Sequence, residues 1–95
     1  VDIDWEYPGV NRPADPNDSY DKGSPGGPED KVNYTLFMAA IRAELDRVGA
    51  LDGRHYELTA AVGIGYDKIA LTDPGQYIQY LDAINLMSYD LYGAW

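Results

Sequence analysis

The chain has 95 residues, of which 45% are apolar and none is cysteine, and it carries a net charge of −9 at neutral pH. An acidic excess of this size argues against nucleic acid and against an anionic membrane surface as partners. No apolar run approaches the roughly 20 residues that a membrane-spanning helix needs. The absence of cysteine leaves the compartment open between a reducing one and the extracellular space.

The two ends of the chain indicate a piece of a larger domain. The first residues lie inside a strand-like run without an initiating methionine, and Trp95 directly follows another such run. We therefore expect residues 1–95 to be an internal fragment of one domain, incomplete at both ends. A signal peptide of the parent protein would not be visible in such a fragment.

The first predicted element is the end of a strand over Val1–Glu6. Acidic and apolar residues alternate along it, and successive side chains of a strand point to opposite faces. We expect the acidic face to line a cavity and the apolar face, with Trp5, to pack against helices. The acids are Asp2, Asp4 and Glu6, and the apolar residues between them are Val1, Ile3 and Trp5.

Residues 8–29 are predicted to form a long loop. They contain five of the six prolines together with several Gly, Asn, Asp and Ser residues. Loops longer than about 15 residues in compact domains are usually functional or disordered. Because this loop directly follows the acidic strand, we expect it to form a cleft wall, with a plain surface insertion as the alternative.

The segment Asp30–Val48 has the clearest helical pattern. Its apolar residues recur at intervals of three and four, which predicts one apolar stripe facing the core. Phe37 is expected in that core, and Gly49 is expected to end the helix. The residues of the stripe are Val32, Leu36, Phe37, Ala40, Ile41, Leu45 and Val48.

Two further strands and one helix complete the pattern. Tyr56–Gly63 and Ala83–Tyr89 are mostly apolar or small, as in strands that are buried on both faces. A short helix is predicted from Asp73 to Tyr80 or just beyond it, with Tyr77 either at the surface or packed between elements. The order strand, helix, strand, helix, strand predicts an α/β fold with parallel strands and helical crossovers.

Two motifs carry a resemblance to a known family. Asp2-Ile-Asp4-Trp-Glu6-Tyr-Pro resembles the signature Asp-Gly-x-Asp-x-Asp-x-Glu of family 18 glycoside hydrolases, the chitinases. Met87-Ser-Tyr89-Asp90 is similar to the second signature of the family, Met-x-Tyr-Asp. The two motifs occur in the order of the family. The leading Asp-Gly of the first signature would lie before the first residue of this chain.

Shorter segments extend the resemblance over nearly the whole chain. They look like the corresponding segments of bacterial chitinases: Tyr56-Glu-Leu-Thr59, Tyr66-Asp-Lys68 and Tyr89-Asp-Leu-Tyr-Gly93. The resemblance implies a TIM (β/α)8 barrel of which this chain supplies approximately strand 4 to strand 6 with the two intervening helices. A complete barrel takes about 250 residues and has its active site at the carboxyl ends of its strands.

The acid row has chemistry that can be argued from the residues themselves. Residues two apart on a strand have Cα atoms about 6.6 Å apart. Because their side chains can lean together, Asp2 and Asp4 could share a proton, and so could Asp4 and Glu6. Like charges this close cannot all ionise cheaply, so one acid should hold a proton near neutral pH. A protonated carboxyl can donate to a glycosidic oxygen, and Glu6, the last of the row, is the expected general acid.

The resemblance implies a role for each remaining member of the site. Family 18 enzymes use the N-acetyl group of the substrate as the nucleophile and retain the anomeric configuration. By this resemblance Asp4 would orient the acetamido group, Asp2 would buffer the charge of Asp4, Tyr89 would donate its hydroxyl to the acetamido oxygen, and Asp90 would bind the same sugar.

Four further residues are expected to contact substrate, and no cofactor or metal is expected. Met87 would line the pocket and Tyr7 would contact the sugar. Ala61 would lie under the acetamido methyl or simply pack in the sheet, and Trp95 would either flank the cleft or pack. His55 is expected to be structural or solvated, without a catalytic role.

Three other interpretations remain open from the sequence. The carboxylates could hold a hard metal ion, because Asp and Glu oxygens are its usual ligands. The chain could come from a catalytically silent chitin- or oligosaccharide-binding protein, although such proteins lack the acid at the position of Glu6. It could also belong to an endo-β-N-acetylglucosaminidase that acts on N-glycans. The resemblance favours a secreted, monomeric chitinase whose partner is chitin or a chito-oligosaccharide.

Overall fold

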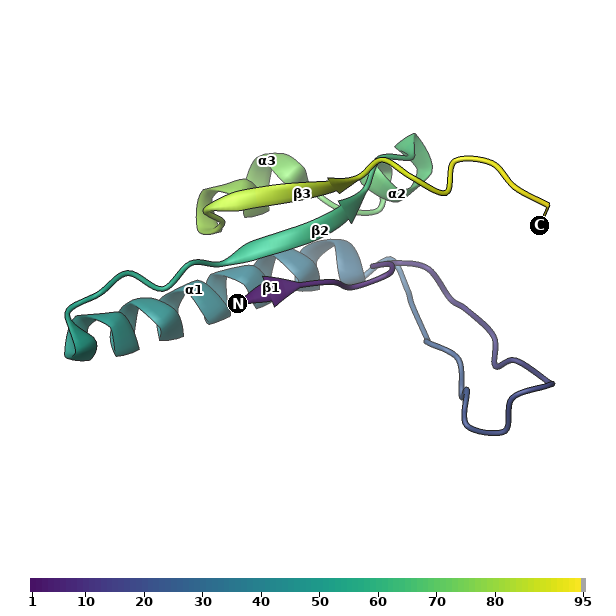
Figure 1. Ribbon diagram of the computed structural model, residues 1–95, viewed down its shortest axis with the longest axis horizontal. Helices are drawn as coiled ribbons and strands as arrows, with labels where there is room; N and C mark the ends of the chain where they lie inside the picture. The colour runs from purple at the N-terminus through teal and green to yellow at the C-terminus, as the bar shows by residue number, and fades with distance from the viewer. Residues whose placement is uncertain (95) are drawn as a thin grey trace.

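The computed structural model describes residues 1–94. It consists of a three-stranded sheet, one long helix and a group of short helices (Figure 1). The elements in chain order are β1 (Asp2–Ile3), α1 (Asp30–Asp52), β2 (Thr59–Gly63), α2 (Tyr66–Ala70), α3 (Pro74–Tyr77), the 3-10 helix η1 (Ile78–Tyr80) and β3 (Ala83–Met87).

The sheet has the order β1-β2-β3 and both neighbouring pairs are parallel, which confirms the predicted α/β arrangement. Ile3 pairs with Ala60, and Ala60 pairs with Ile84, so these three residues share one level and one face. Because the strands are parallel, their carboxyl ends lie at one edge of the sheet. Figure 1 shows that the long loop after β1, helix α2 and the chain after β3 all extend from this edge.

The core lies between the sheet and the helices. Met38 of α1 and Leu58 and Ala60 of the second strand segment have no exposed surface. Tyr34 of α1 and Tyr77 of α3 are 2% and 3% exposed, and their rings meet edge to face with centroids 5.0 Å apart. Tyr77 therefore packs between elements, which was one of the two expectations for it.

Trp5 packs against this core as its place in the alternation predicts. Its ring centroid lies 5.9 Å from that of Tyr34, and the partly buried Ile3 and Ile84 contact the same core residues. Ile3, Trp5 and Ile84 thus cover the face of the sheet that meets the helices. The acid row belongs to the opposite face.

The predicted strands are longer than the observed ones. The first was expected over Val1–Glu6, but only its Asp2–Ile3 part pairs with β2, because β1 has a partner on one side only and its chain then leaves the sheet. The second and third strands were expected over Tyr56–Gly63 and Ala83–Tyr89. They are shorter because pairing begins at Thr59 and ends at Met87.

Helix α1 does not end at Gly49, so that prediction was wrong. The helix continues to Asp52, and Gly53, with φ of +68°, forms the left-handed C-cap. Gly49 is buried, and a Cβ atom there would collide with the carbonyl oxygen of Arg54. The residue at position 49 is therefore small because the returning chain lies against the helix.

The prediction that Phe37 lies in the core was also wrong. Its side chain is 43% exposed, and Val32 and Leu36 are 62% and 60% exposed. The face that meets the sheet is rotated from the expected stripe, because Tyr34 and Met38 form its centre. Ile41 and Leu45 lie on this face and pack against the core as predicted.

Helix α2 was not predicted, and the expected helix after Asp73 is divided into α3 and η1. Pro74 opens α3 as expected, although the Asp73 side chain makes no capping hydrogen bond there. Gln76 and Tyr77 instead donate their backbone N–H groups to the Asp73 carbonyl.

His55 has the structural role that was expected as one possibility. Its Nε2 atom lies 2.7 Å from Oδ1 of Asp82, whose other oxygen accepts the backbone N–H of Leu58 at 2.8 Å. These hydrogen bonds hold the pKa of Asp82 below its usual value, with the Leu58 N–H as the largest cause. They tie the start of β2 to the segment before β3.

Candidate active site

The acid row begins on the face of the sheet that the helices leave uncovered. Ile3 and Ala60 face the helices, so their neighbours Asp2, Thr59 and Ala61 face the other way. The Thr59 hydroxyl donates a hydrogen bond to Oδ1 of Asp2, which agrees with this alternation. Asp4 follows on the same side with an exposed side chain.

Glu6 lies beyond the end of β1, at the carboxyl edge of the sheet, and its side chain is exposed. The next residue, Tyr7, is partly buried there, and the Glu6–Tyr7 peptide bond is cis. The pKa of the Tyr7 hydroxyl is raised above its usual value, first by burial, then by the hydrogen bond and charge of Glu6, and further by Asp4 and Tyr89.

The second motif reaches this edge from β3. Met87 is the last residue of the strand, pairs with Gly63 and is 9% exposed. Tyr89 follows the strand and is 64% exposed. Asp90 has φ of +52°, a left-handed conformation that Asp tolerates better than most residues, so the chain turns immediately after Tyr89.

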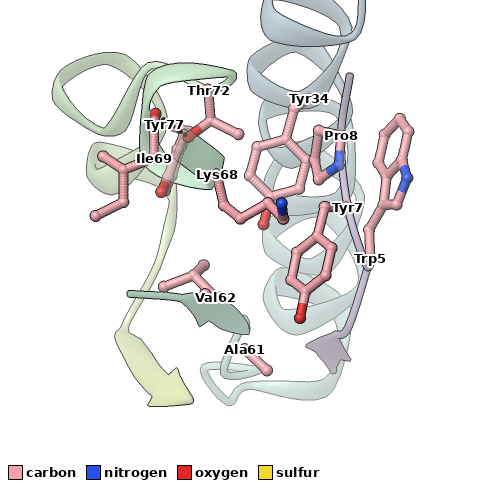
Figure 2. Close-up of a pocket in the computed structure, with 11 residues that line it drawn as sticks. Trp5, Tyr7, Pro8, Tyr34, Ala61, Val62, Lys68, Ile69, Thr72 and Tyr77 are labelled. Atoms are coloured by element: carbon pink, nitrogen blue, oxygen red, sulfur yellow. Dashed lines mark hydrogen bonds between the residues drawn. The ribbon is translucent and has the colours of Figure 1, made fainter. Parts of the chain in front are cut away.

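A small cavity, partly open to solvent, lies at the same edge (Figure 2). Of the residues predicted to bind substrate, Tyr7 and Ala61 line it. Trp5 and the core residues Tyr34 and Tyr77 also line it. The remaining wall consists of Pro8, Val62, Gly63, Lys68, Ile69 and Thr72.

Lys68 is a member of this site to which the sequence assigned no role. Its Nζ atom lies 5.5 Å from the centroid of the Tyr7 ring and 2.6 Å from Oδ2 of Asp67. The hydrogen bond from Lys68 lowers the pKa of Asp67. The segment Tyr66-Asp-Lys68 carries part of the family resemblance, but its sequence predicts no helix and therefore does not place Lys68 beside Tyr7.

The long loop after β1 is held together by specific contacts. Arg12 forms a two-pronged ion pair with Asp21 at 2.6 and 2.8 Å, and its backbone pairs with Ser24. This ion pair lowers the pKa of Asp21. At the base, the N–H groups of Gly9 and Gly27 both donate to Oδ2 of Asp30, at 2.9 and 3.2 Å. Whether the loop forms a cleft wall stays a prediction.

The described part of the chain, residues 1–94, has no group of three His, Cys, Asp or Glu side chains placed to hold a metal ion. None of its helices has the length and apolar character needed to span a bilayer. Trp95, which was expected either at the cleft or in packing, lies outside the described residues.

The family model of glycosyl hydrolases family 18 matches residues 1–95. The chain belongs to this family. Chitinase A of Pseudoalteromonas piscicida is 47% identical to it over all 95 residues, which are 11% of the length of that protein. Chitinase A1 of Niallia circulans is 44% identical over the same residues, which are 12% of its length.

Solved structures of the family match the fold as well as the sequence. Chitinase ChiA74 from Bacillus thuringiensis superposes with a TM-score of 0.85 at 43% identity, covering 100% of this chain and 14% of that one. A family 18 N-acetylglucosaminidase from Paenibacillus barengoltzii superposes with a TM-score of 0.83 at 41% identity, covering 98% of this chain and 25% of that one. The chain thus spans a quarter or less of the length of these relatives.

Proposed function

We propose that this chain is part of the catalytic barrel of a chitinase, which hydrolyses β-1,4 linkages between N-acetylglucosamine units. In this proposal β1, β2 and β3 are strands 4, 5 and 6 of a TIM barrel, and the activity belongs to the whole protein. The observation that carries the proposal is that the parallel strands bring both motifs to one edge of the sheet, with Glu6 beyond the end of β1 and Tyr89 and Asp90 directly after β3. The chitinase names of the similar proteins support the choice of substrate.

The proposed reaction has two steps. In the first, Glu6 donates a proton to the glycosidic oxygen while the carbonyl oxygen of the substrate N-acetyl group attacks the anomeric carbon, so that the glycosidic bond breaks and an oxazolinium ion forms. In the second, Glu6 takes a proton from water, which attacks the same carbon and reopens the ring. The two inversions together retain the anomeric configuration.

The other acids and Tyr89 assist the substrate in this mechanism. Asp4 accepts the acetamido N–H and stabilises the positive charge of the oxazolinium ion, and Asp2 buffers the charge of Asp4. The Thr59 hydroxyl that binds Asp2 keeps that carboxylate beside the row. Tyr89 donates to the acetamido oxygen, and Asp90 binds the same sugar.

Four residues complete the proposed substrate site: Met87, Ala61, Tyr7 and Trp95. We further propose that the parent protein is a secreted monomer that takes chitin or chito-oligosaccharides as its substrate, without a cofactor. A silent sugar-binding protein is not favoured, because Glu6 supplies the carboxyl that such a protein would not need.

The decisive test is Glu6→Gln in the full-length protein that contains this chain. An amide cannot donate the required proton, so turnover of chitin oligomers should fall roughly a hundredfold or more while oligomer binding is retained. Turnover by reducing-end release and affinity by calorimetry would be measured on the same preparation.

The matched control is Glu57→Gln, an exposed glutamate just before the amino end of β2, far from the carboxyl edge. It should leave both quantities unchanged. Near-normal turnover by Glu6→Gln would overturn the assignment of Glu6 and with it the proposed function.

A further inference from the structure

The ring of Tyr7 is held by contacts that the proposed reaction does not explain. On one side Lys68 places its Nζ atom 5.5 Å from the ring centroid. On another, Gly63 approaches so closely that a Cβ atom there would lie 3.2 Å from Cε1 of Tyr7 and 3.6 Å from Cβ of Lys68. Figure 2 shows the Lys68 side chain extending toward Tyr7. The ring is therefore fixed by a cation and by a backbone that carries no side chain.

The position of this ring decides where its hydroxyl lies. A phenol is a rigid group, so fixing the plane of its ring fixes the direction of its O–H bond. Glu6 directly precedes Tyr7 in the chain, and after burial it is the main cause that raises the pKa of the Tyr7 hydroxyl. A phenol is protonated at neutral pH, so this hydroxyl is available as a hydrogen-bond donor to the carboxylate of the neighbouring Glu6.

We propose that Lys68, together with Gly63, is a positioning residue of the active site, which holds the Tyr7 ring so that its hydroxyl orients the Glu6 carboxyl. This inference rests on the proposed function of Glu6. Lys68 acts here through Tyr7 and does not need to touch the substrate. It should therefore affect turnover more than substrate binding.

The pairing of Lys68 with Asp67 supports this role. A lysine side chain is flexible, and one third of that of Lys68 is exposed, so the cation needs a second contact to stay over the ring. Asp67, one residue away on the same short helix, binds Nζ at 2.6 Å. The ion pair and the cation–π contact use the same Nζ atom and thus fix it between Asp67 and Tyr7.

The first experiment compares Lys68→Met with Lys68→Arg in the full-length protein. Met keeps approximately the length of the side chain but removes the cation. Because the cation–π contact with Tyr7 is lost, we expect kcat to fall about two- to fivefold. KM should change less than kcat, and Lys68→Arg should recover kcat because Arg also stacks on aromatic rings. Lys22→Met, on the exposed loop, is the matched control without an expected effect.

The second experiment combines Lys68→Met with Tyr7→Phe. The phenylalanine ring keeps its contact with Lys68 but has no hydroxyl to orient Glu6. If Lys68 acts through that hydroxyl, then Lys68→Met has no further effect on kcat in the Tyr7→Phe protein. A purely structural role of Lys68 would instead give the same loss of kcat in both backgrounds.

The outcomes separate this inference from the proposed function. An unchanged kcat for Lys68→Met, a change in KM alone, or additive effects with Tyr7→Phe would overturn the positioning role. Should Lys68→Met lower the melting temperature enough to obscure kcat, Lys68→Gln with the same cycle decides. If Glu6→Gln retains turnover, the proposed function fails whatever the lysine variants do. If Glu6→Gln is inactive and the lysine variants are normal, only this inference fails.

Discussion

Tyr34 joins the core of the protein to the site at its edge. Its side chain is 2% exposed, meets the rings of Trp5 and Tyr77, and also lines the cavity beside Tyr7. Burial raises the pKa of its hydroxyl to about 12, with smaller contributions from Tyr77 and from the charge of Asp2. Tyr34 therefore stabilises the fold only while its hydroxyl is protonated.

We expect the Tyr34→Phe variant to be more resistant to alkali than the wild-type protein. In the unfolded chain tyrosine loses its proton near pH 10.0, whereas folded Tyr34 holds it to about pH 12. The folded protein therefore binds more protons in this window, so the contribution of Tyr34 to stability is complete below pH 10 and is lost as the pH rises toward 12. The loss should reach about 2 kcal/mol at pH 12.

The measurement is the unfolding temperature of the full-length protein between pH 8 and pH 12, for wild type, Tyr34→Phe and the control Tyr20→Phe. Tyr20 is 91% exposed, so its substitution should not change the alkaline profile. Parallel profiles of wild type and Tyr34→Phe would contradict the prediction.

The acid row shows how far single residues could be predicted. The alternation of acids with Ile3 and Trp5 was sufficient to assign each side chain to a face, since a strand has only two faces. Phe37 was misplaced because a helix offers a continuous range of directions, and seven apolar residues do not fix which of them meets the sheet. Lys68 could not be assigned at all, because its contact with Tyr7 joins residues 61 positions apart.

Among the elements, α1 shows that a glycine near a helix end can have two different causes. Gly53 adopts φ of +68° in the C-cap and would meet no atom with an added Cβ within 4 Å. Gly49 lies within the helix, where an added Cβ would collide with the carbonyl oxygen of Arg54. Gly53 is required because of its left-handed backbone conformation, whereas Gly49 is required because there is no room for a side chain.

We expect both Gly53→Ala and Gly49→Ala to destabilise the protein, and Gly49→Ala to cost more. Alanine in the left-handed conformation of Gly53 costs about 1 kcal/mol. At Gly49, alanine is the better helix former, but it must push the Arg54 backbone away and break the hydrogen bond from the Arg54 N–H to the Gly49 carbonyl, which is 3.0 Å long. Chemical denaturation of the two variants would give the order, and a stabilised Gly49→Ala would show that the returning chain moves freely.

A helix or strand could be predicted where its pattern of apolar residues is long, and could not be predicted where that pattern is short. The helix α1 and the parallel order of the strands follow from periodicity and from the alternation of strands with helices. Helix α2 has five residues, fewer than two turns, so its apolar residues cannot form a recognisable stripe. The residues at which a strand begins and ends are set by its pairing with a neighbouring strand. The sequence of the strand alone does not contain this information.

At the scale of the whole molecule, the sheet within residues 1–94 has two open edges. β1 and β3 each have a partner on one side only. The face that carries the acid row is exposed at Asp2 of β1 and at Ala83 and Asn85 of β3. Within residues 1–94 the buried core is limited to a small cluster: Tyr34, Met38, Leu58, Ala60 and Tyr77. Open edges and an uncovered face leave exposed backbone groups and side chains that a closed sheet would bury.

We therefore expect the isolated 95-residue chain neither to unfold cooperatively nor to cleave chitin. Its few buried side chains gain too little from burial to offset the conformational entropy of ordering the chain, and the proposed active site has strands on one side only. For the 95-residue chain, calorimetry should show no sharp transition, and incubation with chitin oligomers should release no product. The full-length protein should show a sharp transition and should release product. A cooperative melt together with chitin cleavage by the 95-residue chain would mean that three strands suffice to form the site.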